Sequence, residues 1–280
     1  MKNDRLLTRR RALRVGAAVL GAAGAATGTA RLFTIEDPAG EAWNALAAGG
    51  PQVRTPLSAL RLQPMAGYGS PSRPPARTAV RHEPIRRMPE RGRRMVLTFD
   101  DGPNPEYTPG ILRTLREYGV RAMFFVLGKM AAGNKDLLRE MADNGHIVGN
   151  HTWAHPLLTT LPRSKIRSEM ERTCEVIEDA YGEAPLWFRA PYGAWNRDVF
   201  QLGAELGMEP LAWTMDSRDW TTPGTPTIVQ RVEKSAASGV IVLSHDAGGN
   251  RAQSVRALRT YLPYLLDSGY HITVPGRQFT

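Results

Sequence analysis

From residue 95 onward, short apolar runs alternate with longer segments of helical periodicity, and this alternation constrains the fold most. Seven apolar runs predict strands, at 95–99, 122–127, 146–148, 186–188, 211–215, 240–243 and 271–274. Helices are predicted between them, at 108–119, 135–144, 163–181, 197–206, 227–237 and 254–266. Strands that alternate with helices are typical of a mostly parallel α/β domain. Seven strands favour a deformed, incompletely closed (β/α) barrel over an open sheet.

The first thirty residues predict an export signal. The basic stretch TRRRALRV precedes the weakly apolar run GAAVLGAAGAATGTA, which ends in small residues and suits cleavage after Ala30. Arg9, Arg10 and Arg11 resemble a twin-arginine signal, with Ala12 in place of the usual aromatic residue. The run is too short and too rich in glycine for a good membrane span. We therefore expect a secreted or cell-envelope protein, anchored at its N-terminus only if the signal stays uncleaved.

Residues 31–93 predict a flexible linker, because they are rich in Pro, Arg, Gly and Ser and show no sustained apolar period. The net charge of +9 belongs to this linker and the signal, since acids outnumber bases 21 to 19 from residue 95 onward. The domain at 94–280 is therefore not expected to bind nucleic acid. No glycine-rich phosphate loop follows a predicted strand, so nucleotide binding is unsupported too. We expect a monomer whose basic linker can lie against an anionic cell wall or membrane surface.

Two adjacent acids, Asp100 and Asp101, stand at the end of the first predicted strand. Side by side they repel each other, and burying either is costly unless something compensates. A turn is one interpretation, since Asp-Gly-Pro-Asn is ordinary turn chemistry. A metal ion, or a reaction that needs a carboxylate base, is the other.

Polar residues that follow the other predicted strands favour a site over a turn. They are His151, His155, Arg189, Asp216, Asp219, Trp220, His245 and Asp246. In α/β barrels the loops at the carboxyl ends of the strands build the active site. Five separate loops carrying such groups would converge there, which a single turn does not explain.

His151 and His155 are four residues apart, so on a helical turn both rings would point the same way. The pair alone is weak evidence for a metal site. With a carboxylate from another strand end, it forms a set of two histidines and one carboxylate with open coordination positions. Zinc suits such ligands best, and cobalt, iron or manganese are tolerated. Thr152 follows His151 where a zincin peptidase would have glutamate, so that pattern is absent.

Five segments in this order resemble the five motifs of the NodB-type polysaccharide deacetylases, carbohydrate esterase family 4. They are TFDDGP, HTWAH, RAPYG, DSRDW and LSHD. The resemblance spans roughly residues 94–275, and each motif keeps its key residue. It implies a deformed (β/α) barrel and a metal-dependent hydrolase that removes acetyl groups from a polysaccharide substrate.

The resemblance also implies how the first motifs divide their work. Asp101, His151 and His155 would bind the metal. Asp100 would be the general base that activates the attacking water, and Arg189 would orient Asp100.

The remaining motifs would serve the later steps of amide hydrolysis. The backbone N–H of Tyr192 would help to hold the tetrahedral oxyanion. His245 would protonate the leaving amine, with Asp219 tuning it. Trp220 and Leu243 would line the pocket that receives the acetyl methyl group.

Some residues near these motifs have plainer interpretations. Trp153, Trp187 and Trp195 could be groove walls or core residues. Asp246 is expected to be a structural hydrogen-bonding residue, and Asp216 to shape its loop.

These observations predict an exported, metal-dependent deacetylase that hydrolyses N-acetyl groups of a GlcNAc-containing polymer, with peptidoglycan favoured over chitin. An O-deacetylase acting on acetylxylan is one alternative, because the same motifs would serve it. A glycosidase using Asp100 and another acid would have no use for His151 and His155. A catalytically silent carbohydrate-binding domain is the last alternative, and an intact base, metal set and acid argue against it.

Overall fold

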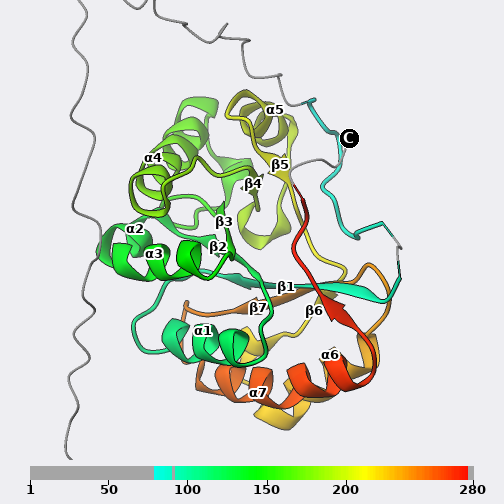
Figure 1. The fold of residues 1–280 in the computed structure, drawn as a ribbon. Coiled ribbons are helices and arrows are strands. Elements are labelled where there is room, and N and C mark those ends of the chain that lie inside the picture. Colours follow the sequence, from blue (N-terminus) through cyan, green and yellow to red (C-terminus); the bar gives the residue numbers. More distant parts are fainter. Residues whose placement is uncertain (1–78, 90–91, 277–280) are drawn as a thin grey trace, which may run out of the picture. The chain divides into compact units, whose positions relative to one another are not determined.

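The computed structural model describes residues 79–89 and 92–276. The predicted export signal and most of the predicted linker lie outside the described residues. A parallel sheet runs through the domain with helices packed around it (Figure 1). The strands are β1 (Arg94–Asp100), β2 (Met123–Val126), β3 (Ile147–Asn150), β4 (Trp187–Phe188), β5 (Glu209–Pro210), β6 (Met215–Asp216), β7 (Ile241–His245) and β8 (His271–Ile272). The helices are α1 (Thr108–Glu117), α2 (Gly128–Gly133), α3 (Lys135–Asp143), α4 (Arg163–Tyr181), α5 (Arg197–Glu205), α6 (Thr225–Ser235) and α7 (Ala252–Asp267).

Seven strands follow the order β5-β4-β3-β2-β1-β7-β6, and their pairings are parallel. The short strand β8 also pairs with β1, off this path. In the described part of the chain the edge strands β5 and β6 do not pair with each other. The sheet is therefore a curled half-barrel, which confirms the predicted deformed (β/α) barrel.

The central strand β1 is buried on both faces, which explains why it reads as a continuous apolar run. Met95, Leu97 and Phe99 pack in the core with residues of α1 and α7. Val96 belongs to a second apolar cluster, which it shares with residues of β2 and β7. Because side chains alternate along a strand, Asp100 lies on the same face as Val96. The strand thus directs its terminal carboxylate away from the helices.

The structure departs from the predicted elements in two places. The apolar run 211–215 is not one strand, because β5 ends at Pro210 and β6 begins at Met215. Leu211 instead forms an isolated bridge with Ile85, a residue of the predicted linker. Helix α2 was not predicted, since its six residues are too few to show a helical period.

Residues 79–89 lie within the stretch predicted to be a linker, yet they pack beside β5. The N–H of Ile85 donates to the carbonyl of Pro210 at 2.9 Å, and its carbonyl accepts from Ala212 at 2.8 Å. Met88 is buried, with 8% of its surface exposed. Two apolar side chains and a short ladder of backbone hydrogen bonds therefore attach this segment to the domain.

We expect a chain that begins at residue 92 to be less stable than one that begins at residue 79. Burying a side chain such as Met88 contributes about 1.5–3 kcal/mol. In a domain of this size each kcal/mol shifts Tm by about 2–4 °C. Losing the segment should therefore lower Tm by roughly 3–12 °C in thermal unfolding followed by circular dichroism. Met88→Ala in the longer chain should reproduce part of that loss, and equal melting of both chains would contradict a stabilising role.

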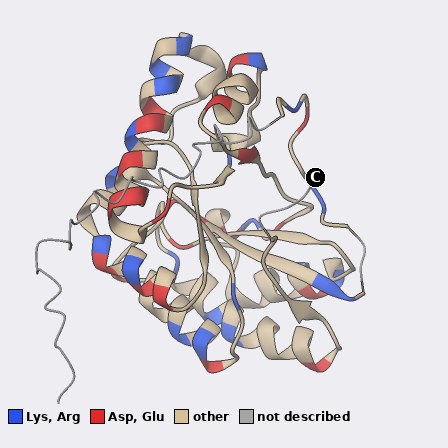
Figure 2. Ribbon diagram, turned by 45° about the horizontal axis from the view of Figure 1, so that its top comes forward, with Lys and Arg blue, Asp and Glu red and all other residues tan. Residues whose placement is uncertain are grey.

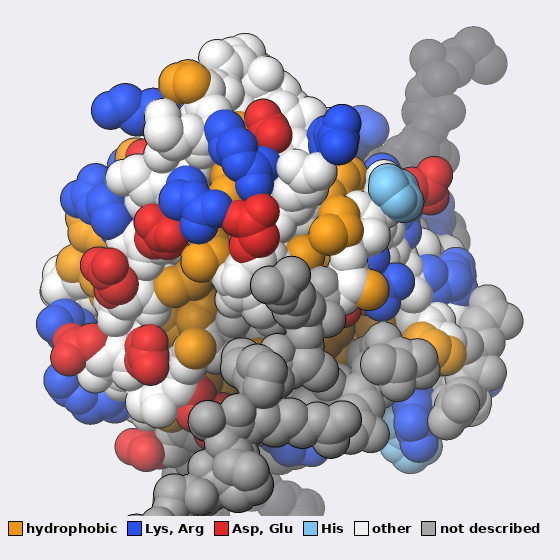
Figure 3. Space-filling view, turned by 90° about the horizontal axis from the view of Figure 1, so that it is seen from above, with side chains coloured by type: hydrophobic (Ala, Val, Ile, Leu, Met, Phe, Trp, Pro, Cys, Tyr) orange, Lys and Arg blue, Asp and Glu red, His pale blue; other side chains and the backbone are white. Residues whose placement is uncertain are grey.

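Basic and acidic residues are interspersed along the helices (Figure 2), and their side chains are interspersed on the face seen in Figure 3. Between α4 and α5, Arg163 pairs with Asp198 at 3.0 Å and with Glu205 at 2.6 Å, and Arg167 also pairs with Glu205. Exposed pairs of this kind contribute only about 0.2–1 kcal/mol each. Within residues 79–89 and 92–276, no helix combines the length and apolar character needed to cross a membrane.

Candidate active site

The carboxyl ends of the strands bring the predicted site residues to one edge of the sheet. Asp100 and His245 are paired positions of the neighbouring strands β1 and β7. His151 and Arg189 directly follow β3 and β4, and Asp219 begins a 3₁₀ turn after β6. Parallel strands end on the same side of a sheet, so residues distant in sequence meet there.

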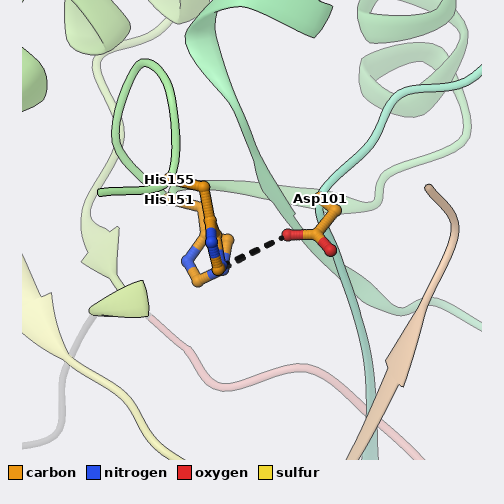
Figure 4. A group of neighbouring side chains, drawn as sticks. All are labelled: Asp101, His151 and His155. Atoms are coloured by element: carbon orange, nitrogen blue, oxygen red, sulfur yellow. Dashed lines mark ion pairs between the residues drawn. The ribbon is translucent and has the colours of Figure 1, made fainter. Parts of the chain in front are cut away.

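Asp101, His151 and His155 form a group that could hold a metal ion (Figure 4). One ligand atom from each lies within 4.8 Å of the others. The Nε2 atoms of His151 and His155 lie 3.7 and 3.6 Å from Oδ1 of Asp101. That oxygen is buried and has no hydrogen-bond partner among the residues that the structure describes. A buried carboxylate oxygen facing two imidazole nitrogens is a donor set that suits a divalent cation.

His151 has the protonation state that a metal ligand needs. Burial lowers its pKa to about 3, so the ring is neutral at physiological pH. Its Nδ1 lies 2.7 Å from the carbonyl oxygen of Arg189, which can only accept a hydrogen bond. Nδ1 therefore carries the proton, and the lone pair of Nε2 is directed at Asp101.

The two histidines do not lie on a helical turn, so that part of the sequence interpretation was wrong. Thr152 and His155 have left-handed backbones, with φ of 71° and 62°. The side-chain oxygen of Asn150 accepts from the N–H of Thr152 at 2.9 Å, and Oγ1 of Thr152 accepts from the N–H of His155 at 3.1 Å. A tight loop held by side-chain hydrogen bonds brings the rings together, with centroids 5.0 Å apart.

Asp100 is buried against a fully buried arginine. Nη1 of Arg189 donates to Oδ1 of Asp100 at 2.7 Å, while its other nitrogens donate to the carbonyls of Leu211 and Ala212. Burial raises the pKa of Asp100, and the positive charge of Arg189 opposes that rise. Oδ2 of Asp100 lies 3.7 Å from Nε2 of His151. The carboxylate is thus fixed beside the metal-ligand group.

His245 is held by a buried aspartate. Its Nδ1 lies 2.7 Å from Oδ1 of Asp219, whose Oδ2 accepts from the N–H of His245 at 2.9 Å and from Oγ of Ser254 at 2.6 Å. Burial opposes the charged imidazolium, but the hydrogen bond and the charge of Asp219 outweigh it and raise the pKa of His245 to about 9. The arrangement keeps His245 protonated, with Nε2 available to donate.

Aromatic and apolar side chains border this polar centre. Tyr192 and Trp220 are 67% and 54% exposed, which is unusual for large aromatic side chains. The ring of Tyr192 packs edge-on against His155, and its backbone is left-handed with φ of 61°. Leu243 is buried on β7, opposite Thr98 of β1. The exposed aromatic surfaces are suited to contact with a sugar ring.

Trp153, Trp187 and Trp195, whose roles the sequence left open, are packed against neighbouring side chains. Trp187 is 4% exposed and belongs to an apolar cluster with residues of β1 and β2. Trp195 packs on two phenylalanine rings, and Trp153 lies under Arg172 at 3.9 Å. Of the two roles considered for them, groove wall and core residue, these contacts support packing.

Both auxiliary aspartates make structural hydrogen bonds, as expected. Oδ1 of Asp216 accepts from the N–H of Arg218 at 2.7 Å within its loop. Oγ1 of Thr108 donates to Oδ2 of Asp246 at 2.5 Å, and burial raises the pKa of Asp246 to about 7.

Two residues in contact with the site were missed in the sequence. Oγ1 of Thr98 lies 2.8 Å from Nη1 of Arg189, and Oγ of Ser254 supports Asp219 at 2.6 Å. Thr98 had a usable signal, because it stands two residues before Asp100 and so faces the same side of β1. Ser254 had none, since only the packing of α7 brings it to Asp219.

Comparison with known proteins places this site in a family. The family model for polysaccharide deacetylases matches residues 87–211. A chitooligosaccharide deacetylase from Rhizobium leguminosarum bv. trifolii is 40% identical over 191 residues, which cover 64% of this chain and 89% of that protein. The chain belongs to the polysaccharide deacetylase family. It is thus a hydrolase whose relatives act on N-acetylated sugars.

Other relatives of this polysaccharide deacetylase agree. A peptidoglycan-N-acetylglucosamine deacetylase from Bacillus cereus is 39% identical over 185 residues, covering 65% of this chain and 86% of that protein. A solved family 4 carbohydrate esterase from Streptomyces lividans, in complex with acetate, superposes with a TM-score of 0.62 at 35% identity. That match covers 66% of this chain and 94% of the solved one.

Proposed function

We propose that this polysaccharide deacetylase is exported, depends on a bound metal, and removes N-acetyl groups from a GlcNAc-containing polymer, with peptidoglycan as the first candidate. The observation that carries the proposal is the grouping of a carboxylate held by Arg189, the histidine–aspartate pair of His245, and the metal-ligand group. Relatives named for chitooligosaccharide and peptidoglycan substrates support the sugar.

The residues present fit a divalent cation held by Asp101, His151 and His155. Neutral imidazole nitrogens and one carboxylate favour zinc, with cobalt and other first-row metals as substitutes. When bound there, the cation would supply Lewis acidity toward the acetyl carbonyl.

The other site residues would perform the proton transfers. Asp100, held by Arg189, takes a proton from the attacking water while the water oxygen adds to the acetyl carbon. The backbone N–H of Tyr192 donates to the tetrahedral oxyanion that forms. His245 then gives its Nε2 proton to the sugar nitrogen as the C–N bond breaks, and Asp219 stabilises the imidazolium beforehand. Acetate and a free amine result.

The apolar part of the site would form the pocket that receives the acetyl methyl group. Leu243 and the exposed ring of Trp220 would line that pocket. Tyr192, in the RAPYG segment, would contact the sugar. These contacts recognise an acetyl group without distinguishing an amide from an ester.

Chelation should abolish activity, and zinc or cobalt should restore it. The physical reason is that the buried Oδ1 of Asp101 has no hydrogen-bond partner among the described residues and faces the Nε2 atoms of His151 and His155, so the cation would be the group that joins the three. Acetate release is measured after treatment with a chelator and again after each metal is added back. His151→Ala should raise the metal concentration needed for half-maximal recovery. Full activity of the metal-free protein would contradict the proposal.

Acetylxylan esterase activity is the alternative that the site geometry leaves open, and one experiment separates the two. The metal-loaded enzyme is incubated in parallel with peptidoglycan, chitooligosaccharide and acetylxylan, and acetyl loss is followed by mass spectrometry. Loss from peptidoglycan or chitooligosaccharide supports the N-deacetylase. Loss from acetylxylan alone would make the enzyme an O-esterase.

Export is proposed on the basis of the N-terminal sequence. Replacing both Arg9 and Arg10 with lysine preserves the charge but not the arginine pair, so precursor should accumulate in the cytoplasm. The measurement is fractionation followed by immunoblotting, with Arg5→Lys as a control outside the arginine run. Normal secretion of the double variant would contradict the twin-arginine route, and Arg11 would then have to be tested for an alternative register.

A further inference from the structure

We propose that Glu169 is a positioning residue that holds the histidine loop, residues 151–155, in the geometry needed to bind a metal. The proposal rests on the proposed metal binding by that loop. Oε2 of Glu169 accepts hydrogen bonds from two consecutive backbone N–H groups, those of Trp153 at 3.0 Å and Ala154 at 2.9 Å. Both donors lie between His151 and His155. One carboxylate oxygen on α4 therefore grips the middle of the loop.

Helix α2 grips the same peptides from the other side. The N–H of Gly128 donates to the carbonyl of Thr152 at 3.0 Å, and the N–H of Lys129 donates to the carbonyl of Trp153 at 3.2 Å. A Cβ on Gly128 would lie 2.4 Å from the ring of Trp153, so the loop and α2 are in close contact. The peptide groups of the loop are thus held between the start of α2 and the side chain of Glu169.

The backbone conformation of the histidine loop explains why it needs these hydrogen bonds. Thr152 and His155 both have positive φ, and Thr152 is β-branched, for which this conformation is strongly disfavoured. A loop held in such a conformation relaxes when its hydrogen-bond partners are removed. Among the described residues, the N–H groups of Trp153 and Ala154 have Glu169 as their hydrogen-bond acceptor.

Relaxation of the loop would act directly on the metal-ligand group. The Nε2 atoms of His151 and His155 converge on Oδ1 of Asp101 only because the loop turns between them. Without Glu169, part of the binding free energy would go into ordering the loop each time a cation binds. Partners outside the ligand set typically change metal affinity about 10–100-fold when removed.

The test is a zinc titration of the metal-free full-length protein by calorimetry, in wild type, Glu169→Ala and Glu169→Gln. Glu171 offers a matched control, because it lies on the same helix and its carboxylate pairs with Arg167 at 3.0 Å instead of contacting the histidine loop. We expect Glu169→Ala to weaken zinc binding about 10–100-fold and Glu171→Ala to leave it unchanged. Glu169→Gln keeps an oxygen that can accept from both N–H groups, so it should recover most of the affinity.

Two further measurements separate positioning from general folding. Thermal unfolding of the metal-free variants reports any loss of stability, and the visible spectrum of the cobalt-loaded protein reports the ligand geometry. We expect an altered cobalt spectrum in Glu169→Ala and wild-type spectra in Glu169→Gln and Glu171→Ala. Equal zinc affinity in Glu169→Ala and Glu171→Ala would overturn the proposal. So would equal losses in Glu169→Ala and Glu169→Gln, because the acceptor oxygen would then be irrelevant.

The titration also keeps this proposal separate from the proposed function. If wild type binds zinc but releases no acetate from any polymer, the proposed deacetylase activity fails. The role of Glu169 can still be measured through zinc affinity. If wild type binds no zinc, both fail together.

Discussion

Asp100→Asn is expected to stop turnover while leaving metal binding intact. The amide side chain is nearly isosteric and its oxygen can still accept from Nη1 of Arg189, which lies 2.7 Å from the carboxylate in the wild type. It cannot take a proton from water at neutral pH. Loss of a general base typically lowers the rate about 10²–10⁴-fold.

The measurements for Asp100→Asn are kcat/KM for acetate release and the zinc affinity of the metal-free protein. Retained activity would remove Asp100 from the role of base, and lost zinc binding would make it a ligand instead. In the wild type, kcat/KM should fall on the acid side as pH drops through the pKa of Asp100, since only the carboxylate can act as a base. Burial raises that pKa in the metal-free protein, and a bound divalent cation would lower it.

His245→Ala should lower kcat/KM about 10²–10⁴-fold, the usual contribution of one general acid. An amide nitrogen leaves poorly unless it is protonated, and Nε2 of His245 is the donor that the pair with Asp219 keeps charged. Kinetics on a substrate with an activated leaving group provide the control. Such a substrate should suffer a smaller loss, whereas equal losses on both substrates would remove His245 from the role of acid.

Asp219→Asn tests the cause of that charge. In the wild type the pKa of His245 is raised to about 9, so kcat/KM should fall on the basic side as the imidazolium loses its proton. A bound divalent cation would move this limb below pH 9. Removing the negative charge of Asp219 should move it lower still. A uniform loss at every pH, with no shift of the basic limb, would show that Asp219 only positions the loop of Trp220.

The same pair makes stability depend on pH. The folded-state pKa of His245 lies above the ordinary value of 6.5, so its contribution is complete below about pH 6.5. It is lost as pH rises through about 9. This follows because the folded protein holds a proton there that the unfolded chain releases earlier.

Much of the fold could be predicted because it depends on local patterns. Helix α4 matches its predicted span of 163–181, since nineteen residues show a clear helical period and Gly182 ends the helix with a φ of 92°. Helix α2 and the short strands β5 and β6 were missed or merged because too few residues carry their pattern. Residues 79–89 were read with a polar, Pro- and Arg-rich stretch, although Ile85 and Met88 attach them to the domain.

By itself, the sequence determined the alternation of strands and helices and the segments that carry site residues at the carboxyl ends of the strands. Those properties follow from side-chain periodicity and from which residues directly follow each strand. Only the tertiary structure decided the partners: Arg189 with Thr98, Ser254 with Asp219, and Glu169 with the histidine loop. These contacts join residues 15 to 91 positions apart. Strand order, register and helix packing set such distances, and a side chain's own neighbours in the sequence do not encode them.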